Sequence, residues 1–384
     1  MANALKKSIL ILTPFYRPNI GGVESYLSDL SEYLKAHGFA VYVLTYQPLT
    51  TRVKAPAYEA RDNLKIRRIN WPGYNLFHRL EPYPLLEFIY LTPCLFVYTF
   101  FLLLAGQKDF DVIHAQGLNA AFITRILAKV FHKRAVMSTC AVYNLKIGYL
   151  FSRIVRWTLS GMDKILALGE YSKKELLSIG VPAAKVEAYG LWVDQSQYVS
   201  KDKQAAREKV GLKAKFIVLF VGRFIKIKGI EALIEAARRL EKAINFVFVG
   251  DQGPLLNYLE KEAVRQDNVI LIKGISGLEL VPYYQAADLL VVPSLYDEAF
   301  GKVIIEALSC GTPVIGSSRG AIPNIINNSV GRIIEPKAES IAREIDYMYR
   351  NPEVLAKITA NCRVYAEDNF GEKNIEVITK SYYA

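Results

Sequence analysis

Residues 289–316 read LLVVPSLYDEAFGKVIIEALSCGTPVIG, and this stretch decides the fold. The apolar run 289–292 is typical of a buried parallel strand, and Pro293 and Ser294 end it. Apolar residues with helical spacing follow over 300–308, and a Gly-Thr-Pro turn then leads into a second apolar strand. The order strand, helix, strand predicts an α/β protein whose parallel sheet is covered on both faces.

Two carboxylates flank the glycine that starts this helix. Glu298 falls in the strand-to-helix loop, and Glu306 falls about two turns inside the helix. The first free N–H groups, near Gly301 and Lys302, and the helix dipole favour an anion such as a phosphate. Glu306 is then placed to accept hydrogen bonds from a ribose diol, with Glu298 facing a sugar beyond the phosphate. Two solvated acids at a helix end are the alternative, but the spacing suits a nucleotide sugar bound by Phe300, Gly301, Lys302 and Glu306.

A second loop brings two cations together. The apolar strand predicted at 216–221 runs into Gly222 and Arg223, and Lys228 and Gly229 open the helix after it. Glycine permits close approach of the backbone to a ligand. Arg223 and Lys228 add two positive charges to the same loop, so we predict a clamp for a diphosphate.

Three separated motifs give the chain a family resemblance. Gly21 and Gly22 follow the first predicted strand and open a helix, where they form either a simple turn or a binding loop. Together with the G-R…K-G loop and the E-x7-E pair, they make nearly the whole chain resemble the GT-B glycosyltransferases, specifically the retaining nucleotide-sugar enzymes of glycosyltransferase family 4. The resemblance implies two Rossmann-like doubly wound domains facing across a cleft. It also implies that Gly21 and Gly22 approach the diphosphate or the acceptor.

The pattern of apolar runs agrees with two domains. A more polar stretch at 195–215 separates two series of strands, so we predict an N-terminal acceptor-binding domain at 1–195 and a nucleotide-sugar-binding domain at 196–369. The resemblance implies that a helix at 370–384 crosses back onto the first domain. The predicted strands are 9–12, 40–45, 112–114, 135–138 and 164–168 in the first domain, and 216–221, 245–249, 269–272, 289–292 and 313–316 in the second.

Positive charge is concentrated in the first domain. The chain carries a net charge of +11, and residues 1–195 hold 23 Lys and Arg against 14 Asp and Glu. Such a field favours phosphates of nucleic acid, anionic lipid or a lipid-linked acceptor. Nucleic acid is the weakest of these partners, because no helix-turn-helix, zinc, RRM or KH signature accompanies the charge. Between Asp111 and Asp163 there is no acidic residue, and the basic residues there include Lys129, Lys133, Arg134, Lys146, Arg153 and Arg156.

Residues 85–105 form an apolar segment long enough to span a bilayer. A span would place predicted strands of one sheet on opposite sides of the membrane, and Glu87 and Pro93 also oppose it. The alternatives are two half-helices bent at Pro93, an apolar face lying in the membrane interface, or a wholly buried core helix. The adjacent basic field favours docking to an anionic membrane surface, with Phe96, Phe100 and Phe101 as examples of exposed positions.

Cysteines and the N-terminus bear on location. The four cysteines lack C-x-x-C or metal-site spacing, so a reducing compartment is expected. The run at 9–12 resembles a short signal sequence, but no small-residue cleavage site follows, and a first strand is the better interpretation. We therefore expect a cytoplasmic protein, peripheral on the inner face of the cell membrane.

The resemblance implies a retaining hexosyltransferase. It moves a sugar from a UDP- or GDP-sugar to a hydroxyl of a lipid or lipid-linked glycan, with Arg223, Lys228, Glu298 and His114 as the catalytic residues. No cofactor and no metal are expected, since the protein's cations hold the diphosphate and no D-x-D follows a strand. A soluble-acceptor glycosyltransferase, a related epimerase or phosphorylase, and a non-catalytic nucleotide-sugar-binding subunit are the alternatives.

Three segments depart from the family pattern. The segment DVIHAQ at 111–116 has Gln116 where many relatives have a second histidine, so His114 or Gln116 replaces a histidine that contacts the transferred sugar. His114 also fits a packing role at a strand end. The usual G-G-x-P-E loop reads GAIPN at 320–324, and the usual N-G-V-D reads YGLWVD at 189–194. These departures bear on the donor sugar and the acceptor more than on the reaction class.

Overall fold

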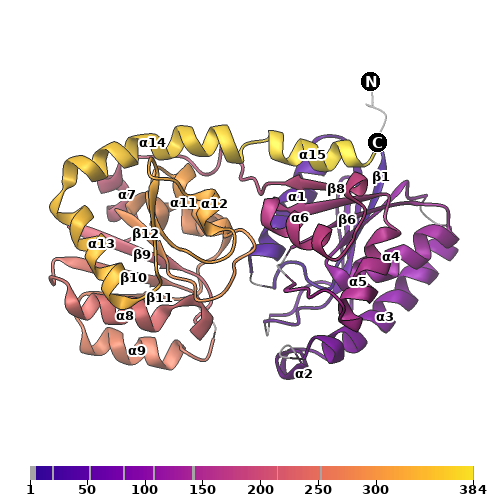
Figure 1. The fold of residues 1–384 in the computed structure, drawn as a ribbon, viewed down its shortest axis with the longest axis horizontal. Coiled ribbons are helices and arrows are strands. Elements are labelled where there is room, and N and C mark those ends of the chain that lie inside the picture. Colours follow the sequence, from indigo (N-terminus) through magenta and orange to yellow (C-terminus); the bar gives the residue numbers. More distant parts are fainter. Residues whose placement is uncertain are drawn as a thin grey trace. The chain divides into compact units, whose positions relative to one another are not determined.

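The structure is a computed structural model that describes residues 6–19, 21–51, 53–80, 83–106, 109–140, 143–213, 215–250 and 253–383. The chain forms two compact units, coloured by sequence in Figure 1. Unit 1 comprises Met1–Gly190 and Ile375–Ala384, and unit 2 comprises Leu191–Asn374. Each boundary lies five residues from the one predicted, and each unit is an α/β domain built on its own sheet.

Unit 1 contains an eight-stranded sheet with the order β3-β4-β2-β1-β5-β6-β7-β8. Neighbouring strands are parallel except for β3 and β4, which form an antiparallel hairpin at one edge. The sheet reverses its order at β1, which pairs with β2 on one side and β5 on the other. The strands are β1 (Ser8–Leu12), β2 (Ala40–Tyr46), β3 (Tyr58–Arg61), β4 (Leu64–Ile69), β5 (Val112–Gln116), β6 (Arg134–Ser138), β7 (Lys164–Leu168) and β8 (Val186–Tyr189).

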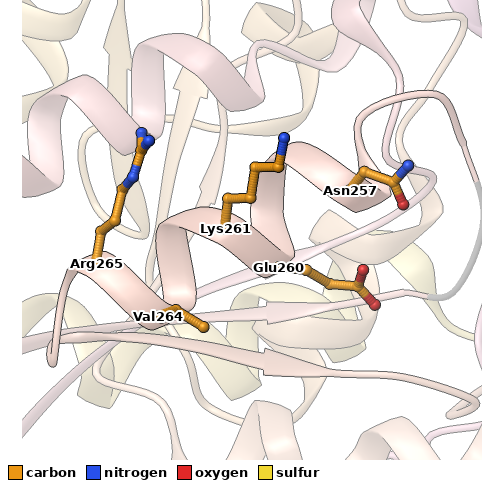
Figure 2. Close-up of a pocket in the computed structure, with 5 residues that line it drawn as sticks. All are labelled: Asn257, Glu260, Lys261, Val264 and Arg265. Carbon is orange, nitrogen blue, oxygen red and sulfur yellow. The ribbon is translucent and has the colours of Figure 1, made fainter.

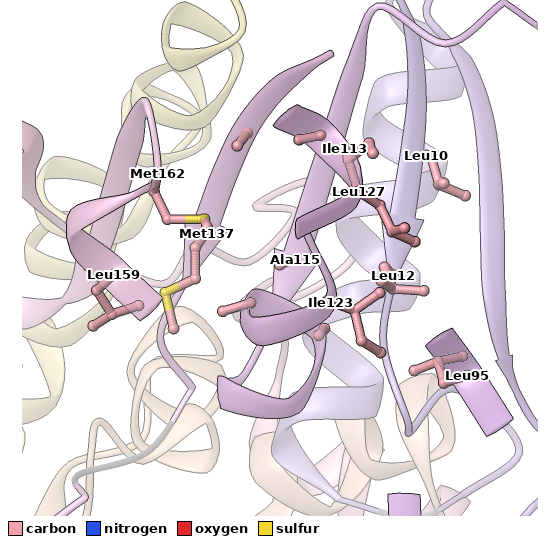
Figure 3. Packing of buried hydrophobic residues seen from close by; sticks show 14 of the residues in the cluster. Leu10, Leu12, Leu95, Ile113, Ala115, Ile123, Leu127, Met137, Leu159 and Met162 are labelled. Atoms are coloured by element: carbon pink, nitrogen blue, oxygen red, sulfur yellow. The ribbon is translucent and has the colours of Figure 1, made fainter. Parts of the chain in front are cut away.

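Alternation along the strands of unit 1 produces two packed faces. Leu10, Ile113 and Met137 point into one core, shown in Figure 3, together with apolar residues of α3, α4, α5 and α6. His114 and Gln116 belong to the opposite face, where Tyr382, the residue directly after α15, contacts His114. The helices are α1 (Gly22–Ala36), α2 (Tyr74–Leu80), α3 (Pro84–Leu104), α4 (Leu118–Val130), α5 (Leu150–Ser160), α6 (Gly169–Ser178) and α15 (Lys373–Ser381), with a short 3₁₀ turn, η1 (Ala183–Lys185).

Helix α3 is the apolar segment predicted at 85–105. It is one continuous helix through Pro93, so two half-helices bent at that residue are a wrong prediction. A wholly buried core helix is wrong as well, because only 22% of the apolar window Leu85–Leu104 is buried. Its length and mean hydropathy of 1.8 would suffice to cross a membrane, but its inner face packs on α4 through Leu91 and Leu95.

The outer face of α3 is apolar along its whole length. At successive turns it exposes Leu86, Ile89, Val97, Phe101 and Leu104, with Ile89 58% and Phe101 60% exposed. A soluble helix normally presents polar residues to water. Two of the three phenylalanines suggested as exposed are not, because Phe96 and Phe100 are partly buried against the unit 1 core.

Unit 2 contains a six-stranded parallel sheet with the order β11-β10-β9-β12-β13-β14. Helix α8 packs against α13, and α11 packs against α14. The strands are β9 (Phe216–Val221), β10 (Ile244–Val249), β11 (Val269–Ile272), β12 (Leu289–Val292), β13 (Val314–Ser317) and β14 (Gly331–Ile334). The helices are α7 (Lys203–Lys209), η2 (Lys226–Lys228), α8 (Ile230–Arg239), α9 (Leu256–Arg265), η3 (Gly277–Leu280), α10 (Val281–Ala286), α11 (Lys302–Ser309), α12 (Ile322–Ile325), α13 (Ala338–Arg350) and α14 (Pro352–Phe370).

Candidate active site

The two predicted donor loops of unit 2 meet at one place in the sheet. Strands β9 and β12 are neighbours, and the chain order reverses between them, because β10 lies on the other side of β9. In open parallel sheets, such a reversal leaves a crevice at the carboxyl ends of the strands, where ligands bind. The G-R…K-G loop leaves the end of β9 and the Glu298 loop leaves the end of β12, so the fold brings them together.

Gly229 makes this approach possible. Its φ is +74°, in the left-handed region that favours glycine, and a Cβ there would overlap the carbonyl oxygen of Pro293 at the end of β12. Leu295 N also donates to Ile227 O at 2.8 Å. The backbone of η2 is therefore held directly against the β12 loop, which sets the position of Lys228.

Lys228 and Glu298 form the centre of the site. Lys228 Nζ lies 2.5 Å from Glu298 Oε1 and 3.0 Å from the Tyr296 hydroxyl, and Ser294 Oγ donates to the same Glu298 oxygen at 2.6 Å. Burial opposes ionisation of Glu298, but the Lys228 ammonium and these hydrogen bonds outweigh it and lower the pKa of the carboxyl. Burial likewise opposes the charge of Lys228, yet Glu298 raises the pKa of the amine. The two groups form an ionised pair.

The GAIPN loop supports Glu298 from behind. Gly320 has a φ of +57°, and a Cβ there would lie 2.5 Å from the Glu298 nitrogen. Ala321 N donates to Glu298 O at 2.8 Å, and Gly320 N donates to Asp297 Oδ1 at 3.0 Å. Ala321 itself has an ordinary right-handed backbone, so the second glycine of the family pattern is not needed for this conformation. The departure from that pattern leaves the support of Glu298 intact.

Helix α11 places a second acid and a third cation at the same end of the sheet. Gly301, with a φ of +88°, is its N-cap, and Lys302 is its first residue. The Lys302 side chain is buried, with Nζ 3.5 Å from Glu306 Oε1. Glu306 accepts hydrogen bonds from the hydroxyls of Tyr198 at 3.2 Å and Tyr284 at 2.7 Å. The sequence pattern identified Glu306 but not these partners, because Tyr198 lies 108 residues and Tyr284 22 residues before it, in other elements of unit 2.

The remaining predicted donor residues of unit 2 lie on the same loops. Gly222 and Arg223 directly follow β9 and are partly exposed. Phe300 is buried and packs edge-on against Phe370 at the end of α14, with ring centroids 6.1 Å apart. Its contacts anchor the loop before Gly301, and a direct role of Phe300 in nucleotide binding stays a prediction.

In unit 1, Gly21 and Gly22 lie at the start of α1, as expected from the sequence. A Cβ at Gly21 would lie 3.1 Å from Glu24 Cδ, whereas a Cβ at Gly22 would meet no atom of the described residues within 4 Å. Glu24 is the third residue of the helix, and its carboxylate lies beside Gly21 at the N-terminus. Gly21 therefore makes room for a carboxylate of its own helix, and an anion at this end of α1 would have to compete with Glu24.

His114 lies inside unit 1. It is 1% exposed, and its ring nitrogens contact the Tyr382 hydroxyl at 2.8 Å and Ser138 Oγ at 2.7 Å. Burial lowers the pKa of His114 to about 3, so the ring is neutral at physiological pH. This environment matches the packing role that the sequence left open, and a catalytic role for His114 stays an unsupported prediction. Gln116, two residues on, lies at the carboxyl end of the same strand face.

Within the described ranges, no group of three or more His, Cys, Asp and Glu side chains is arranged to hold a metal ion. Figure 2 shows a surface depression on α9 of unit 2. Its lining side chains all project from that one helix, so it is an open face and not an enclosed pocket, and we assign no function to it. They are Asn257, Glu260, Lys261, Val264 and Arg265.

Comparison with known proteins identifies the family. Residues 20–197 match Glycosyltransferase Family 4, and residues 202–365 match Glycosyl transferases group 1. The two matches together cover most of the chain, which belongs to the GT-B glycosyltransferases of family 4 and group 1. The two matched regions correspond closely to the two units.

Several similar proteins match this chain over nearly its whole length. An uncharacterized glycosyltransferase, MJ1607, of Methanocaldococcus jannaschii is 26% identical over 96% of this chain and 97% of its own. A D-inositol 3-phosphate glycosyltransferase of Streptomyces bingchenggensis is 25% identical over 97% of this chain and 87% of its own. Among solved structures, sucrose-phosphate synthase from Thermosynechococcus elongatus has a TM-score of 0.80 at 22% identity, with 98% of each chain covered. Anabaena Alr3699/HepE in complex with UDP-glucose has a TM-score of 0.75 at 18% identity, covering 98% of this chain and all of its own. These likenesses confirm the GT-B fold.

Proposed function

We propose that this glycosyltransferase moves a sugar from a UDP- or GDP-sugar to a hydroxyl of a membrane-associated acceptor, with retention of configuration. The observation that carries the proposal is the Lys228–Glu298 pair at the switch point of the unit 2 sheet. A cation for the diphosphate and a carboxylate for the sugar lie side by side there. The nucleotide sugar in the HepE complex is consistent with a donor of this class.

Charge stabilisation is the main task of the residues in unit 2. The leaving diphosphate gains negative charge as the sugar–oxygen bond breaks, and preorganised donors lower the barrier by meeting that charge. Lys228, Arg223, Lys302 and the first amides of α11 supply such donors. Since Lys228 is already held by Glu298 and Tyr296, it needs little reorganisation when the diphosphate arrives.

Glu298 acts on the sugar and not as a free base. Its charge is balanced by Lys228, and Ser294 fixes one of its oxygens. A carboxylate of lowered pKa is a poor proton acceptor, but it accepts hydrogen bonds from sugar hydroxyls well. We propose that Glu298 orients the sugar for a front-face transfer, in which the departing diphosphate and the acceptor lie on the same side. Glu306 binds the ribose through the carboxylate that Tyr198 and Tyr284 hold in place.

The surface of unit 1 is the reason for proposing a membrane-associated acceptor. The apolar stripe of α3 continues to helix α5 through an edge-on contact of Phe88 with Phe122 and a tilted contact of Phe122 with Trp157. Around α5, Lys146, Arg153 and Arg156 are exposed beside apolar side chains such as Tyr149 and Leu150. Lys133 and Arg134 do not join this group, because Lys133 pairs with Asp109 and Arg134 Nε donates to Ser381 O. An apolar stripe with a basic flank suits the inner face of an anionic membrane.

Incubation with labelled UDP- and GDP-sugars and a lipid extract tests the transfer. Labelled lipid is the expected product, and activity should persist in EDTA, because Lys and Arg take the place of a divalent ion. Free epimer or sugar phosphate would indicate a related enzyme with other chemistry. Loss of activity in EDTA that Mg²⁺ restores would contradict metal independence.

Vesicle flotation tests the membrane surface. The protein should float with phosphatidylglycerol vesicles far more than with neutral ones, and salt should release it. Ile89→Ser, Val97→Ser and Phe101→Ser combined should abolish flotation without changing the melting temperature. Leu95→Ser, on the buried face of α3, is the matched control and should lower the melting temperature by several degrees. A parent protein that ignores both kinds of vesicle would contradict the membrane assignment.

A non-catalytic nucleotide-sugar-binding subunit is the second candidate. The buried His114 favours it, since the histidine expected to contact substrate is held by Tyr382 and Ser138. Nucleotide-induced stabilisation without turnover on any donor and lipid fraction would support this candidate over the transferase.

A further inference from the structure

Arg363 lies on α14, the helix that packs against α11 (Figure 1). Its guanidinium donates to backbone carbonyls of segments that are far apart in the chain. Nη1 donates to Ser309 O at 2.9 Å and to Tyr198 O, and Nη2 donates to Gln195 O at 2.8 Å. Nε donates to Glu367 Oε1 at 2.5 Å, one turn further along α14. One side chain therefore connects α14, the end of α11 and the segment before α7, all within unit 2.

The two acceptors of Nη1 both belong to the surroundings of Glu306. Ser309 is the last residue of α11, the helix that carries Glu306, and a cation at this end of a helix is also favoured by the helix dipole. Tyr198 donates from its hydroxyl to Glu306 Oε1 at 3.2 Å. Because one nitrogen donates to both carbonyls, it fixes how far the Tyr198 backbone lies from the end of α11. That distance decides whether the Tyr198 hydroxyl reaches the Glu306 carboxylate.

The two oxygens of the Glu306 carboxylate are held from different segments. Tyr284 donates to Oε2 at 2.7 Å, and its own carbonyl accepts from the Thr312 hydroxyl at 2.6 Å. Oε1 lies 3.2 Å from the Tyr198 hydroxyl and 3.5 Å from Lys302 Nζ. Tyr198 therefore shares with Lys302 the control over how Oε1 is turned. A carboxylate accepts from both hydroxyls of a diol only when its two oxygens face them, so its orientation has to be set before the ribose binds.

The shape of arginine suits this role. A guanidinium is planar and presents five N–H donors in a fixed fork, whereas a lysine ammonium is a point charge on a flexible chain. The fork of Arg363 holds carbonyls of two segments at once. A lysine at this position would keep a positive charge near the end of α11, but it would not keep the spacing between α11 and Tyr198.

We propose that Arg363 is a positioning residue of the ribose subsite. It holds the Tyr198 backbone at a fixed distance from α11, so that the Tyr198 hydroxyl orients the Glu306 carboxylate toward the ribose diol. The inference rests on the proposed function, in which Glu306 binds the ribose of the donor. Arg363 itself does not touch the nucleotide and acts only through Tyr198 and α11.

Nucleotides with and without the ribose diol test this role in the full chain. The probes are UDP and GDP, each compared with its 2′,3′-dideoxy form, and binding is measured by calorimetry below the melting temperature. The wild type should bind the full nucleotide about tenfold more tightly than the dideoxy form, the range for hydrogen bonds to a charged group. In Arg363→Lys this preference should fall to about threefold or less, because only the full nucleotide loses a contact.

Steady-state kinetics with the complete donor give a second measure. The ribose contact is made in both the ground state and the transition state, so its loss should raise KM and leave kcat nearly unchanged. Arg363→Lys should raise the KM for the donor about five- to tenfold, with kcat within about twofold of the wild type. A variant that merely misfolds would instead lower kcat, because less of the protein is active, and leave KM unchanged.

Two further variants separate positioning from stability. Tyr198→Phe keeps the ring and removes the hydroxyl, and it should lose the diol preference to the same extent as Arg363→Lys. If Arg363 acts through Tyr198, the double variant should be no worse than either single variant. Arg238→Lys is the matched control, because it exchanges another bonded arginine of unit 2, the partner of the buried Glu262. It should lower the melting temperature and keep the diol preference of the wild type.

The outcomes distinguish the inference from the function on which it rests. The inference is wrong if Arg363→Lys weakens the full and the dideoxy nucleotide equally, or if Arg363→Lys or Tyr198→Phe keeps the wild-type preference. In these cases the proposed function stands. A wild type without any preference for the diol also overturns the inference, together with the assignment of Glu306 to ribose. If Arg363→Lys does not fold, Arg363→Gln replaces it in the same comparison. If neither UDP nor GDP binds the wild type, the proposed function itself fails.

Discussion

Lys228 has two roles in this protein. It balances the buried charge of Glu298 in the free protein, and in the proposed reaction it meets the charge of the leaving diphosphate. Lys228→Ala should therefore lower turnover by about 10²–10³-fold, the scale for one preorganised donor. It should also cost about 3 kcal/mol of stability, because Glu298 is left buried without its partner. Turnover and urea unfolding measure the two effects.

A double variant separates these two tasks. Lys228→Met with Glu298→Gln removes both charges, so stability should return most of the way while turnover stays low. Arg223→Ala should lower turnover over a similar range, and Arg223→Lys should restore only part of it, because the planar guanidinium is lost. Near-normal turnover in both alanine variants would show that the loop does not hold the diphosphate.

His114 should make unit 1 sensitive to acid. Its pKa is about 3 in the folded protein and about 6.5 in an unfolded chain, so the unfolded state binds the extra proton first. The free energy of unfolding is therefore highest above pH 6.5, where the ring is neutral in both states. It decreases by up to about 1.4 kcal/mol per pH unit as the pH falls from 6.5 toward 3. His114→Gln does not titrate, so its urea unfolding curve between pH 7 and 4 should be flatter than that of the wild type. Parallel pH dependences would contradict this.

The sequence predicted which strands carry the site residues, but it did not always predict which face of the sheet they lie on or what they do there. Alternation along β5 puts His114 and Gln116 on one face, and that much follows from their spacing. The hydrogen-bond partner of His114 does not follow from spacing, because Tyr382 lies just after α15, 268 residues further along the chain. Tyr198 and Tyr284, the partners of Glu306, likewise had no sequence signal, because they belong to other elements that only the fold brings to this carboxylate.

At the element scale, continuous apolar runs were predicted well and short or charged strands were not. The strands with buried runs, such as β9 and β12, lie within a residue or two of the predicted bounds. The hairpin of β3 and β4 was missed because YEAR and LKIRRI contain no continuous apolar run, although apolar and charged residues alternate in them as in a half-buried strand. β8 (VEAY) and β14 (GRII) were missed because each includes a charged residue and lacks a continuous apolar run. For α3, the apolar composition predicted a helix. Because apolar residues occur on every side of this helix, the sequence does not show which face packs against the protein.

Gly320 lies in the loop that packs against the backbone of Glu298. Gly320→Ala places a Cβ against the Glu298 backbone in a left-handed conformation, so it should displace the loop, cost at least 2 kcal/mol and lower turnover strongly. Ala321→Gly restores the glycine of the family pattern next to it and is the matched control. It should cost less than about 1 kcal/mol and leave turnover nearly unchanged. Similar losses in the two variants would mean that this loop does not position Glu298.

On the scale of the whole molecule, each unit has its own sheet and core, so a ligand confined to one unit should protect that unit alone. UDP or GDP at a hundredfold excess over its Kd stabilises the state that binds it by about 2.7 kcal/mol. Hydrogen exchange should therefore slow in Leu191–Asn374 and stay the same in Met1–Gly190. Glu306→Gln should weaken this protection, because the buried carboxylate proposed to bind ribose is gone.

Glu298→Gln, by contrast, should leave the effect of the bare nucleotide largely intact and reduce the additional effect of the complete donor. Arg239→Ala, which removes exposed ion pairs with Glu235 and Glu339, is the control and should respond as the wild type does. Protection that rises equally in both units, or that is strongest in unit 1, would place the nucleotide elsewhere. Since the Glu306 and Glu298 variants differ in which ligand they lose, the pair also assigns ribose and sugar to separate carboxylates.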